Sequence, residues 1–192
     1  GRAGIETTIF EREACLGGVP RHVIPSFRIA NETIEKDIAL MQKYDVEVKC
    51  GAPAPSVDEL KKMGYTHILF AVGAWKPGKL DIPGDVAGAI QWMKGVKAGN
   101  IAVGGNVVVV GGGNTAMDAA RLAKRSGAKN VTLVYRRTKK YMPADEHELA
   151  LALQDGVAFA ELAAPVAQAD GVLKCEQMKL CEADASGRRS PV

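Results

Sequence analysis

Apolar residues recur along this chain with the period of a helix in some segments and the period of a strand in others, and Gly and Pro separate the segments. In the first half, a Ser followed three residues later by Glu forms a capping box, which predicts a helix start. A wholly apolar run that ends at a glycine is typical of a buried strand. The elements predicted for this half are strands over residues 6–11, 46–50 and 67–72, helices over 31–43 and from Ser56 to about Gly64, and a connector over 76–88.

The second half has the pattern of a βαβ unit. An apolar strand, a glycine turn, a helix with an alanine face and a second apolar strand span about 30 residues, the usual length of such a unit. Beyond them the pattern predicts another helix and then short strands that resemble a β-meander. The predicted elements are strands over 106–110 and 131–135, helices over 115–125 (ended by Gly127) and from Pro143 to about Gln154, and turns at Asp170-Gly171 and Ser186-Gly187.

A near-repeat relates the two halves. Residues 6–12 (ETTIFER) align with residues 131–137 (VTLVYRR), which places Glu11 opposite Arg136. Both segments are predicted to be second strands of Rossmann units. The glycine turn of the second copy begins 25 residues before Arg136, and the same spacing before Glu11 falls upstream of residue 1. We therefore expect the chain to be cut at its start and, on its own, to carry little or no FAD.

Composition narrows the class of protein. The chain has 192 residues, 47% hydrophobic and 24% charged, which is typical of a globular domain, or of one domain with part of another. The net charge is only +3, so neither nucleic acid nor an anionic membrane is an expected partner. No apolar stretch approaches the roughly 20 residues of a membrane span, and the N-terminus lacks a secretion signal. A cytoplasmic location is the expectation.

The cysteines and histidines do not suggest a metal or redox centre. The four cysteines are scattered without a CxxC spacing, which favours free thiols in a reducing compartment over a metal site, an iron-sulfur site or a redox dithiol. The three histidines are interpreted as structural. Tyr135 and Lys139 match the Y-x-x-x-K pattern of short-chain dehydrogenases, but Tyr135 is expected to end a strand and not to lie on a helix, so we take the match as accidental. No catalytic residue and no metal ligand is predicted.

The glycine turn carries the clearest chemical signal. It reads G-x-G-x-x-A between a strand and a helix, the context of a dinucleotide-binding turn, whereas a plain glycine turn is the alternative. Glycine lets the backbone turn tightly and approach a pyrophosphate, whose negative charge meets the amides at the helix N-terminus. The residues predicted to bind pyrophosphate are Gly111, Gly112, Gly113, Asn114 and Thr115.

Charges at two strand ends predict which nucleotides bind. An NAD site has an acid after the second strand, but Arg136 and Arg137 stand there, and guanidinium groups can bind the 2′-phosphate of NADP(H). A solvated basic turn or a weak nucleic-acid patch is the alternative. Glu11 stands at the end of the other strand, and its carboxylate can accept hydrogen bonds from the free ribose hydroxyls of FAD or NAD. The alternative is an exposed glutamate without a binding role.

With these segments placed, the sequence resembles the NADPH-dependent glutamate synthase small-subunit family, a branch of the glutathione-reductase-like flavoproteins with two dinucleotide-binding domains. The stretches GGVPRHVIPSFRI and AVGAWKPGKL look closest to a selenate-reductase-like branch, and dihydropyrimidine dehydrogenase is a more distant likeness. Nearly the whole chain takes part in the resemblance. It rests on FEREACLGGVPRHVIPSFRI, HILFAVGAWKP with the later IPG, VVVVGGGNTAMDAARLAKRSGA, VYRRTKKYMPADE and MKLCEADASGRRSPV.

The resemblance implies an α/β fold in which an FAD domain is interrupted by an NADPH domain. It places a partial FAD domain and connector in residues 1–98 and an NADP-binding domain, truncated at its C-terminal end, in 99–192. Hydride would pass from NADPH to FAD in this oxidoreductase, and electrons would continue through iron-sulfur clusters, in segments absent here, to an electron-accepting subunit or domain. A non-catalytic NADP(H)-binding module is the rival hypothesis.

The same resemblance assigns residues to the FAD site. Glu11 would hold the FAD ribose, Gly17 and Gly18 would lie along its pyrophosphate, and Arg28 would sit near the flavin. Gly73 would back the FAD, with Val72 standing where the family has a threonine.

Overall fold

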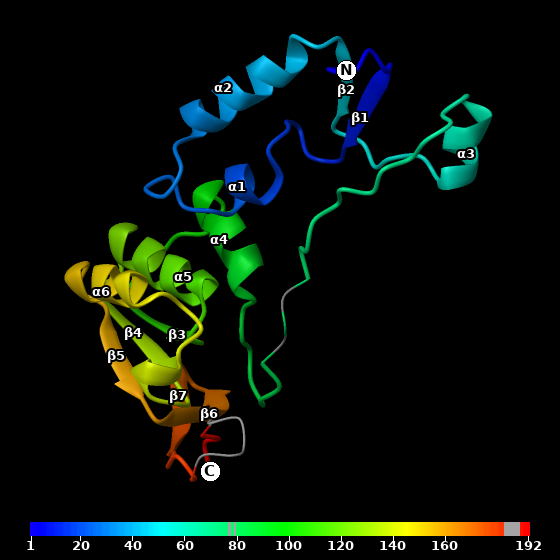
Figure 1. Cartoon of the computed structure of the whole chain (residues 1–192). Helices are drawn as coiled ribbons and strands as arrows, with labels where there is room; N and C mark the ends of the chain where they lie inside the picture. Colours follow the sequence, from blue (N-terminus) through cyan, green and yellow to red (C-terminus); the bar gives the residue numbers. More distant parts are fainter. Residues whose placement is uncertain (77, 79, 183–188) are drawn as a thin grey trace. The chain divides into compact units, whose positions relative to one another are not determined.

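The computed structural model describes residues 1–76, 78, 80–182 and 189–192 of the chain. The chain forms two compact units, Gly1–Lys76 and Pro77–Val192 (Figure 1). Helix α4 (Ala89–Lys97), which lies before the domain boundary expected at residues 98 and 99, belongs to the second unit, where it packs against α5 (Asn114–Arg125). The sequence pattern did not predict α4, although its buried Met93 marks an inward face.

The first unit is built on a two-stranded parallel sheet. Strands β1 (Thr7–Glu11) and β2 (Val46–Cys50) pair from Thr7–Val46 to Glu11–Cys50, and α2 (Asn31–Gln42) connects them. The short helix α1 (Gly18–His22) packs against α2, which buries Ile34 and also packs against β2. Helix α3 (Val57–Lys62) begins with the predicted capping box, in which Ser56 and Glu59 bond reciprocally.

The strand predicted over residues 67–72 does not form. These residues pair with no strand in the part of the chain that the structure describes. The side chains of Leu69, Phe70 and Val72 are 91%, 70% and 73% exposed. A strand needs a partner to satisfy its backbone N–H and C=O groups, so the prediction of a buried strand here is wrong for the structure of this chain.

The second unit contains the expected Rossmann-like arrangement. Its parallel sheet has the strand order β3 (Asn106–Val110), β4 (Asn130–Tyr135), β5 (Ala158–Glu161). Helices α5 and α6 (Glu146–Gln154) pack together against this sheet (Figure 1). The core is formed by small residues of α5, by Val131 and Leu133 of the central strand, and by Leu149 and Ala152 of α6. The remaining elements of this unit are the 3-10 turn η1 (Lys139–Tyr141), β6 (Ala163–Ala169) and β7 (Val172–Gln177).

Three details of this unit correct the sequence predictions. Helix α6 starts at Glu146, not at Pro143, because Asp145 caps it by accepting a hydrogen bond from the N–H of His147. Strand β5 is not part of an antiparallel meander but extends the parallel sheet, because α6 returns the chain beside β4. Strands β6 and β7 form an antiparallel pair, with the predicted turn at Asp170-Gly171 between them. The turn expected at Ser186-Gly187 lies outside the described residues.

The near-repeat corresponds to a repeated topology. β1 is followed by α2 and the parallel strand β2, just as β4 is followed by α6 and the parallel strand β5. Glu11 therefore ends β1 at the position equivalent to the end of β4, where Arg136 follows. This supports the interpretation of both strands as second strands of Rossmann units.

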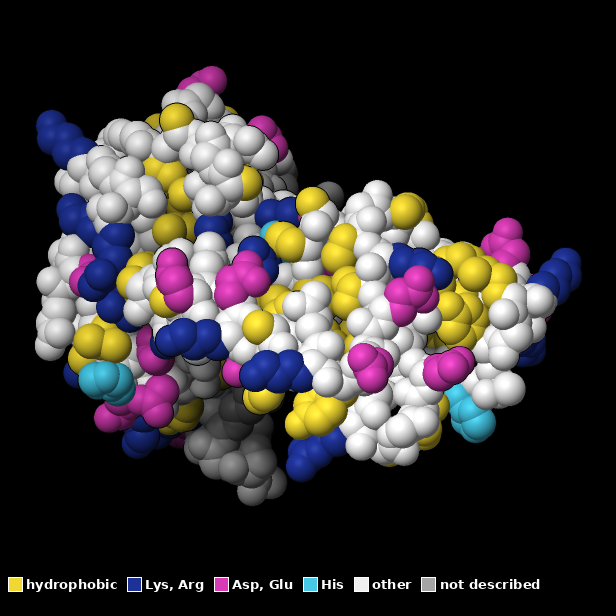
Figure 2. All heavy atoms as spheres, turned by 90° about the horizontal axis from the view of Figure 1, so that it is seen from above, with side chains coloured by type: hydrophobic (Ala, Val, Ile, Leu, Met, Phe, Trp, Pro, Cys, Tyr) yellow, Lys and Arg dark blue, Asp and Glu magenta, His cyan; other side chains and the backbone are white. Residues whose placement is uncertain are grey.

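Several general expectations can be compared with the described residues. None of the helices there combines the length and apolar character needed to cross a membrane. The four cysteines are free, and no group of metal-ligating residues occurs within the described ranges. On the face seen in Figure 2, basic and acidic side chains are interspersed.

Candidate functional site

The glycine turn between β3 and α5 leaves its backbone open. The N–H of Gly111 donates to Val134 O at 3.0 Å, which ties the turn to the central strand, and the φ of Gly111 is 140°, a value that disfavours other residues. A Cβ on Gly113 would meet nothing within 4 Å. Open space therefore lies beside the backbone where a pyrophosphate is predicted to approach.

The N-terminus of α5 is suited to an anion. Gly113 is the N-cap, no side chain caps the helix, and no acidic residue lies in the first turn. Asn114 and Thr115 are exposed, and the N–H groups at the start of a helix have no intrahelical acceptor. These donors, together with the helix dipole, favour negative charge at this point.

Gly112 is required for a different reason from its neighbours. A Cβ at this position would lie 2.5 Å from Cε2 of Tyr135, so the tyrosine ring occupies the space that a side chain would need. The carbonyl of Gly112 accepts a hydrogen bond from the N–H of Ala144 at 3.0 Å. The middle of the turn is thus held by packing and by the segment after β4.

The two arginines after β4 differ in environment. Arg136 is exposed, whereas Arg137 is half-buried and its Nε is buried without a hydrogen-bond partner. A buried donor without an acceptor is costly, so this atom is a group that a bound anion can satisfy. Lys139 and Lys140 follow on the exposed η1 turn, and the N–H of Lys139 donates to Oε2 of Glu161 at 2.9 Å.

The residues assigned to FAD lie in the first unit. Glu11 is half-buried at the end of β1, and its Oε1 accepts from the N–H of Glu13 at 2.9 Å. Arg28 is exposed, and Gly73 follows the unpaired 67–72 segment with a φ of 70°. Gly17 and Gly18, with φ values of 122° and 52°, start α1.

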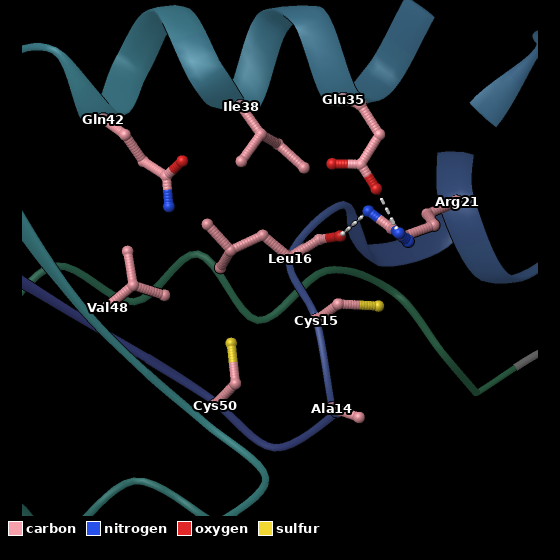
Figure 3. A pocket seen from close by; sticks show the side chains of 9 residues that line it. All are labelled: Ala14, Cys15, Leu16, Arg21, Glu35, Ile38, Gln42, Val48 and Cys50. Atoms are coloured by element: carbon pink, nitrogen blue, oxygen red, sulfur yellow. Dashed lines mark hydrogen bonds and ion pairs between the residues drawn. The ribbon is translucent and has the colours of Figure 1, made fainter. Parts of the chain in front are cut away.

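Gly17 also has a structural role. A Cβ there would lie 2.6 Å from Cβ of Arg21. Arg21 donates from Nη1 to Leu16 O at 3.3 Å, and its Nη2 forms an ion pair with Glu35 of α2. The hydrogen bond to Glu35 raises the pKa of Arg21. Figure 3 shows this pair at a hollow of about 220 Å³ between α2 and the loop after β1. The pair ties α1, and with it the glycines at its start, to α2.

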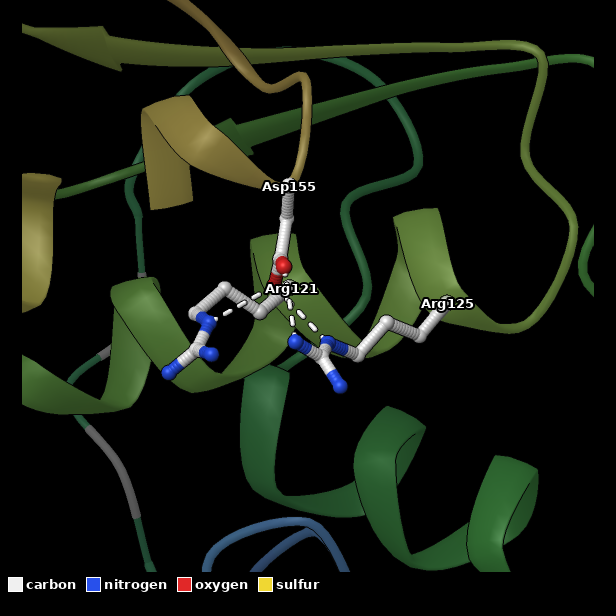
Figure 4. Close-up of polar contacts among 3 residues, drawn as sticks. All are labelled: Arg121, Arg125 and Asp155. Carbon is white, nitrogen blue, oxygen red and sulfur yellow. Dashed lines mark hydrogen bonds and ion pairs between the residues drawn. The ribbon is translucent and has the colours of Figure 1, made fainter. Parts of the chain in front are cut away.

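A second ion-pair cluster, which the sequence analysis missed, fixes α5 in the second unit. Asp155, just after α6, accepts from Nε and Nη2 of Arg125 at 2.8 and 2.7 Å and from Nε of Arg121 at 2.8 Å (Figure 4). The hydrogen bond from Arg125, joined by that from Arg121, lowers the pKa of Asp155 to about 2. The sequence signal for this cluster was the spacing of Arg121 and Arg125, which lie four residues apart and therefore on one face of the helix.

Comparisons with known proteins identify relatives of this chain. The profile of the pyridine nucleotide-disulphide oxidoreductase family matches residues 1–173. The chain is 41% identical to YgfK of Escherichia coli K12, 34% to the NADPH-Fe(3+) oxidoreductase subunit beta of Geobacter sulfurreducens and 31% to the glutamate synthase [NADPH] small chain of Azospirillum brasilense. These alignments include 98–100% of the chain but only 19%, 31% and 44% of the three relatives.

Solved structures share the fold at low identity. Mycobacterium tuberculosis FprA in complex with NADPH superposes with a TM-score of 0.74 at 16% identity, over 97% of this chain and 60% of FprA. The thioredoxin reductase of T. acidophilum gives a TM-score of 0.54 at 14% identity, over 100% of this chain and 67% of the reductase. Both solved structures therefore share the α/β fold of this chain.

Proposed function

Because the chain belongs to the pyridine nucleotide-disulphide oxidoreductase family, whose members bind FAD and NAD(P), we propose that it is the nucleotide-binding part of an NADPH-dependent flavin oxidoreductase subunit. The observation that carries the proposal is the second unit's open glycine turn, with two arginines after the next strand. Residues 99–192 would form the NADP-binding domain and residues 1–98 part of the FAD domain with its connector. Helix α4 precedes residue 99 but packs against α5, so it would be part of the NADP-binding domain.

The residues around the turn fit NADPH in charge and in space. Gly111, Gly112 and Gly113 would border the pyrophosphate, with the N–H groups of Asn114 and Thr115 donating to it. Arg136 and Arg137 would bind the 2′-phosphate, and the unpartnered Nε of Arg137 is a donor for it. The bound nucleotide would supply a hydride for flavin reduction.

The first unit would contribute to the FAD site. The carboxylate of Glu11 would accept from the ribose hydroxyls, and Gly17 and Gly18 would lie along the pyrophosphate. Gly17 is the less specific of the two, because Arg21 and Ile34 already require a glycine there. Arg28 would lie near the flavin and Gly73 against it.

The electron route beyond flavin is taken from the relatives. The beta subunit of the Geobacter sulfurreducens NADPH-Fe(3+) oxidoreductase and the glutamate synthase small chain are parts of larger NADPH-linked enzymes by name. By analogy, we propose that electrons leave through iron-sulfur clusters outside this chain to an electron-accepting partner. A cytoplasmic location stays a prediction and accords with the four free cysteines.

Titration with NADPH and NADH tests the 2′-phosphate site. Arg136→Ala and Arg137→Ala each remove a charge-assisted contact to a phosphate, a loss of about 1.5 to 3 kcal/mol or roughly ten- to a hundredfold in affinity. NADPH binding should weaken by that order, NADH binding should hardly change, and the NADPH effect should shrink at high salt. Isothermal titration calorimetry of both nucleotides measures the two affinities.

Lys129→Ala is the matched control, because it removes an exposed positive charge at the opposite end of β4 and should leave both affinities unchanged. Equal losses of NADH and NADPH in the arginine variants would show that the arginines only maintain the fold.

Flavin content distinguishes a flavin oxidoreductase from the alternative, a non-catalytic NADP(H)-binding module. A full-length protein that binds NADPH but is colourless would be such a module.

A further inference from the structure

Tyr135 lies between the two parts of the nucleotide site and touches both. Its ring fills the space beside Gly112, at the middle of the glycine turn. Its hydroxyl donates to the carbonyl of Tyr141 at 2.7 Å, in the segment that carries Lys139 and Lys140. The side chain is 8% exposed. One buried residue therefore contacts both the turn predicted to hold pyrophosphate and the basic segment that follows β4.

The segment after β4 folds back toward the glycine turn. The N–H of Tyr141 donates to Thr138 O at 3.0 Å, and the N–H of Met142 donates to Lys139 O at 3.1 Å. The segment then reaches the turn through the hydrogen bond from Ala144 to Gly112. The Tyr135 hydroxyl fastens the middle of this segment to the end of the strand from which Arg136 and Arg137 emerge.

Packing alone does not account for a tyrosine here. A phenylalanine would fill the space beside Gly112 equally well, and a buried hydroxyl is costly unless it is hydrogen-bonded. The hydroxyl of Tyr135 meets this requirement by donating to the Tyr141 carbonyl of the η1 segment. The presence of this hydroxyl in a buried position therefore points to a role in positioning that segment.

We propose that Tyr135 is a positioning residue that couples the pyrophosphate turn to the basic segment, and that discrimination between NADPH and NADH depends on its hydroxyl. The inference rests on the proposed nucleotide site and adds a specificity determinant to it. The ring would support binding of either nucleotide, because both carry the pyrophosphate. The hydroxyl would support only the binding of the 2′-phosphate, which NADH lacks.

The variant Tyr135→Phe separates the two contacts, because it keeps the ring against Gly112 and removes the bond to Tyr141 O. We expect NADPH affinity to fall about two- to tenfold, the range for one lost hydrogen bond, and NADH affinity to stay within about twofold. Tyr141→Phe is the matched control, since it removes a tyrosine hydroxyl in the same segment but keeps the carbonyl that Tyr135 bonds. It should change neither affinity.

A double-mutant cycle tests the ring contact. Gly112→Ala introduces a methyl group against the ring and should weaken NADPH and NADH alike, by about tenfold or more. In the Tyr135→Val background, where the ring is gone, the added loss from Gly112→Ala should be much smaller. Thermal unfolding of each variant shows whether the fold is kept.

The outcomes are distinct. If the unmodified chain shows no preference for NADPH, the proposed 2′-phosphate site and this inference fall together. If the preference exists and Tyr135→Phe leaves it intact, or weakens both nucleotides equally, the inference alone is overturned. Additive effects in the cycle would likewise overturn the role of the ring.

Discussion

Asp155 illustrates how single residues stabilise the second unit. Its carboxylate joins α6 to two arginines of α5, and the pKa of about 2 lies below the ordinary value of 3.8. A carboxylate whose pKa is lower in the folded state stabilises the fold above its unfolded pKa, and this stabilisation is lost as pH falls toward the folded value. The window for the loss is therefore from about pH 4 to pH 2.

We predict that Asp155→Asn lowers the free energy of unfolding by about 2 kcal/mol at pH 7, since the pKa difference corresponds to that order of energy. The difference between variant and parent should disappear near pH 2, where a protonated aspartate resembles asparagine. Urea unfolding at a series of pH values measures it. Asp81→Asn, an exposed carboxylate of the same unit, is the control. A loss that stays constant down to pH 2 would contradict the role of the charge.

The candidate site residues could be proposed from the sequence where the chemistry that marks them is local. The glycines of the turn follow from backbone freedom, and Arg136 and Arg137 follow from their position after a strand. Tyr135 was not predictable, because its roles depend on Gly112 and Tyr141, which meet it only in the folded unit. The unpartnered Nε of Arg137 is likewise a property of packing, not of spacing.

At the scale of elements, the central strand β4 organises the second unit. It pairs with β3 on one side and β5 on the other, and Leu133 in its middle is fully buried. A buried leucine in such a place touches both the sheet and the helices that cover it. The stability of this unit therefore depends strongly on the packing of a single strand.

Leu133→Ala should destabilise the second unit by about 3 to 5 kcal/mol, the usual range for a leucine truncated in a rigid core. Val108→Ala removes apolar surface from the neighbouring strand at a side chain that is 47% exposed, and should have a much smaller effect. Chemical denaturation of both variants provides the comparison. Similar losses for the two substitutions would mean that β4 is not the packed centre of the unit.

Prediction of elements succeeded where the signal was contained in the segment. The capping box at Ser56 and the βαβ unit around the glycine turn need no distant partner to be recognised. Prediction failed for residues 67–72 because a strand depends on a neighbour, and for β5 because the direction of pairing depends on where α6 returns the chain. Helix α4 was missed because it follows a connector rich in Gly and Pro.

At the scale of the molecule, the chain consists of two compact units with one tryptophan in each. Trp75 belongs to the first unit, where Arg12 lies 5.1 Å from its ring centroid. Trp92 belongs to the second unit and packs against the core around α5. The two fluorophores therefore report on different units.

We expect the units to unfold in separate transitions. Trp92→Phe leaves Trp75 as the reporter of the first unit, and Trp75→Phe leaves Trp92 as the reporter of the second. In these backgrounds, Leu133→Ala should move the Trp92 transition to lower denaturant and leave the Trp75 transition in place. Fluorescence during urea titration measures both, and an equal shift of the two would show that the chain unfolds as one cooperative unit.

The unpaired segment at residues 67–72 has a consequence for solubility. Its sequence, HILFAV, combines high β-propensity with the absence of a charged residue or proline, and Leu69, Phe70 and Val72 within it are exposed. Such segments template intermolecular β-pairing. The isolated chain should therefore form thioflavin-positive aggregates at a rate that rises with protein concentration. Phe70→Lys should slow this aggregation, because the lysines of neighbouring chains would repel one another when the segments stack as strands.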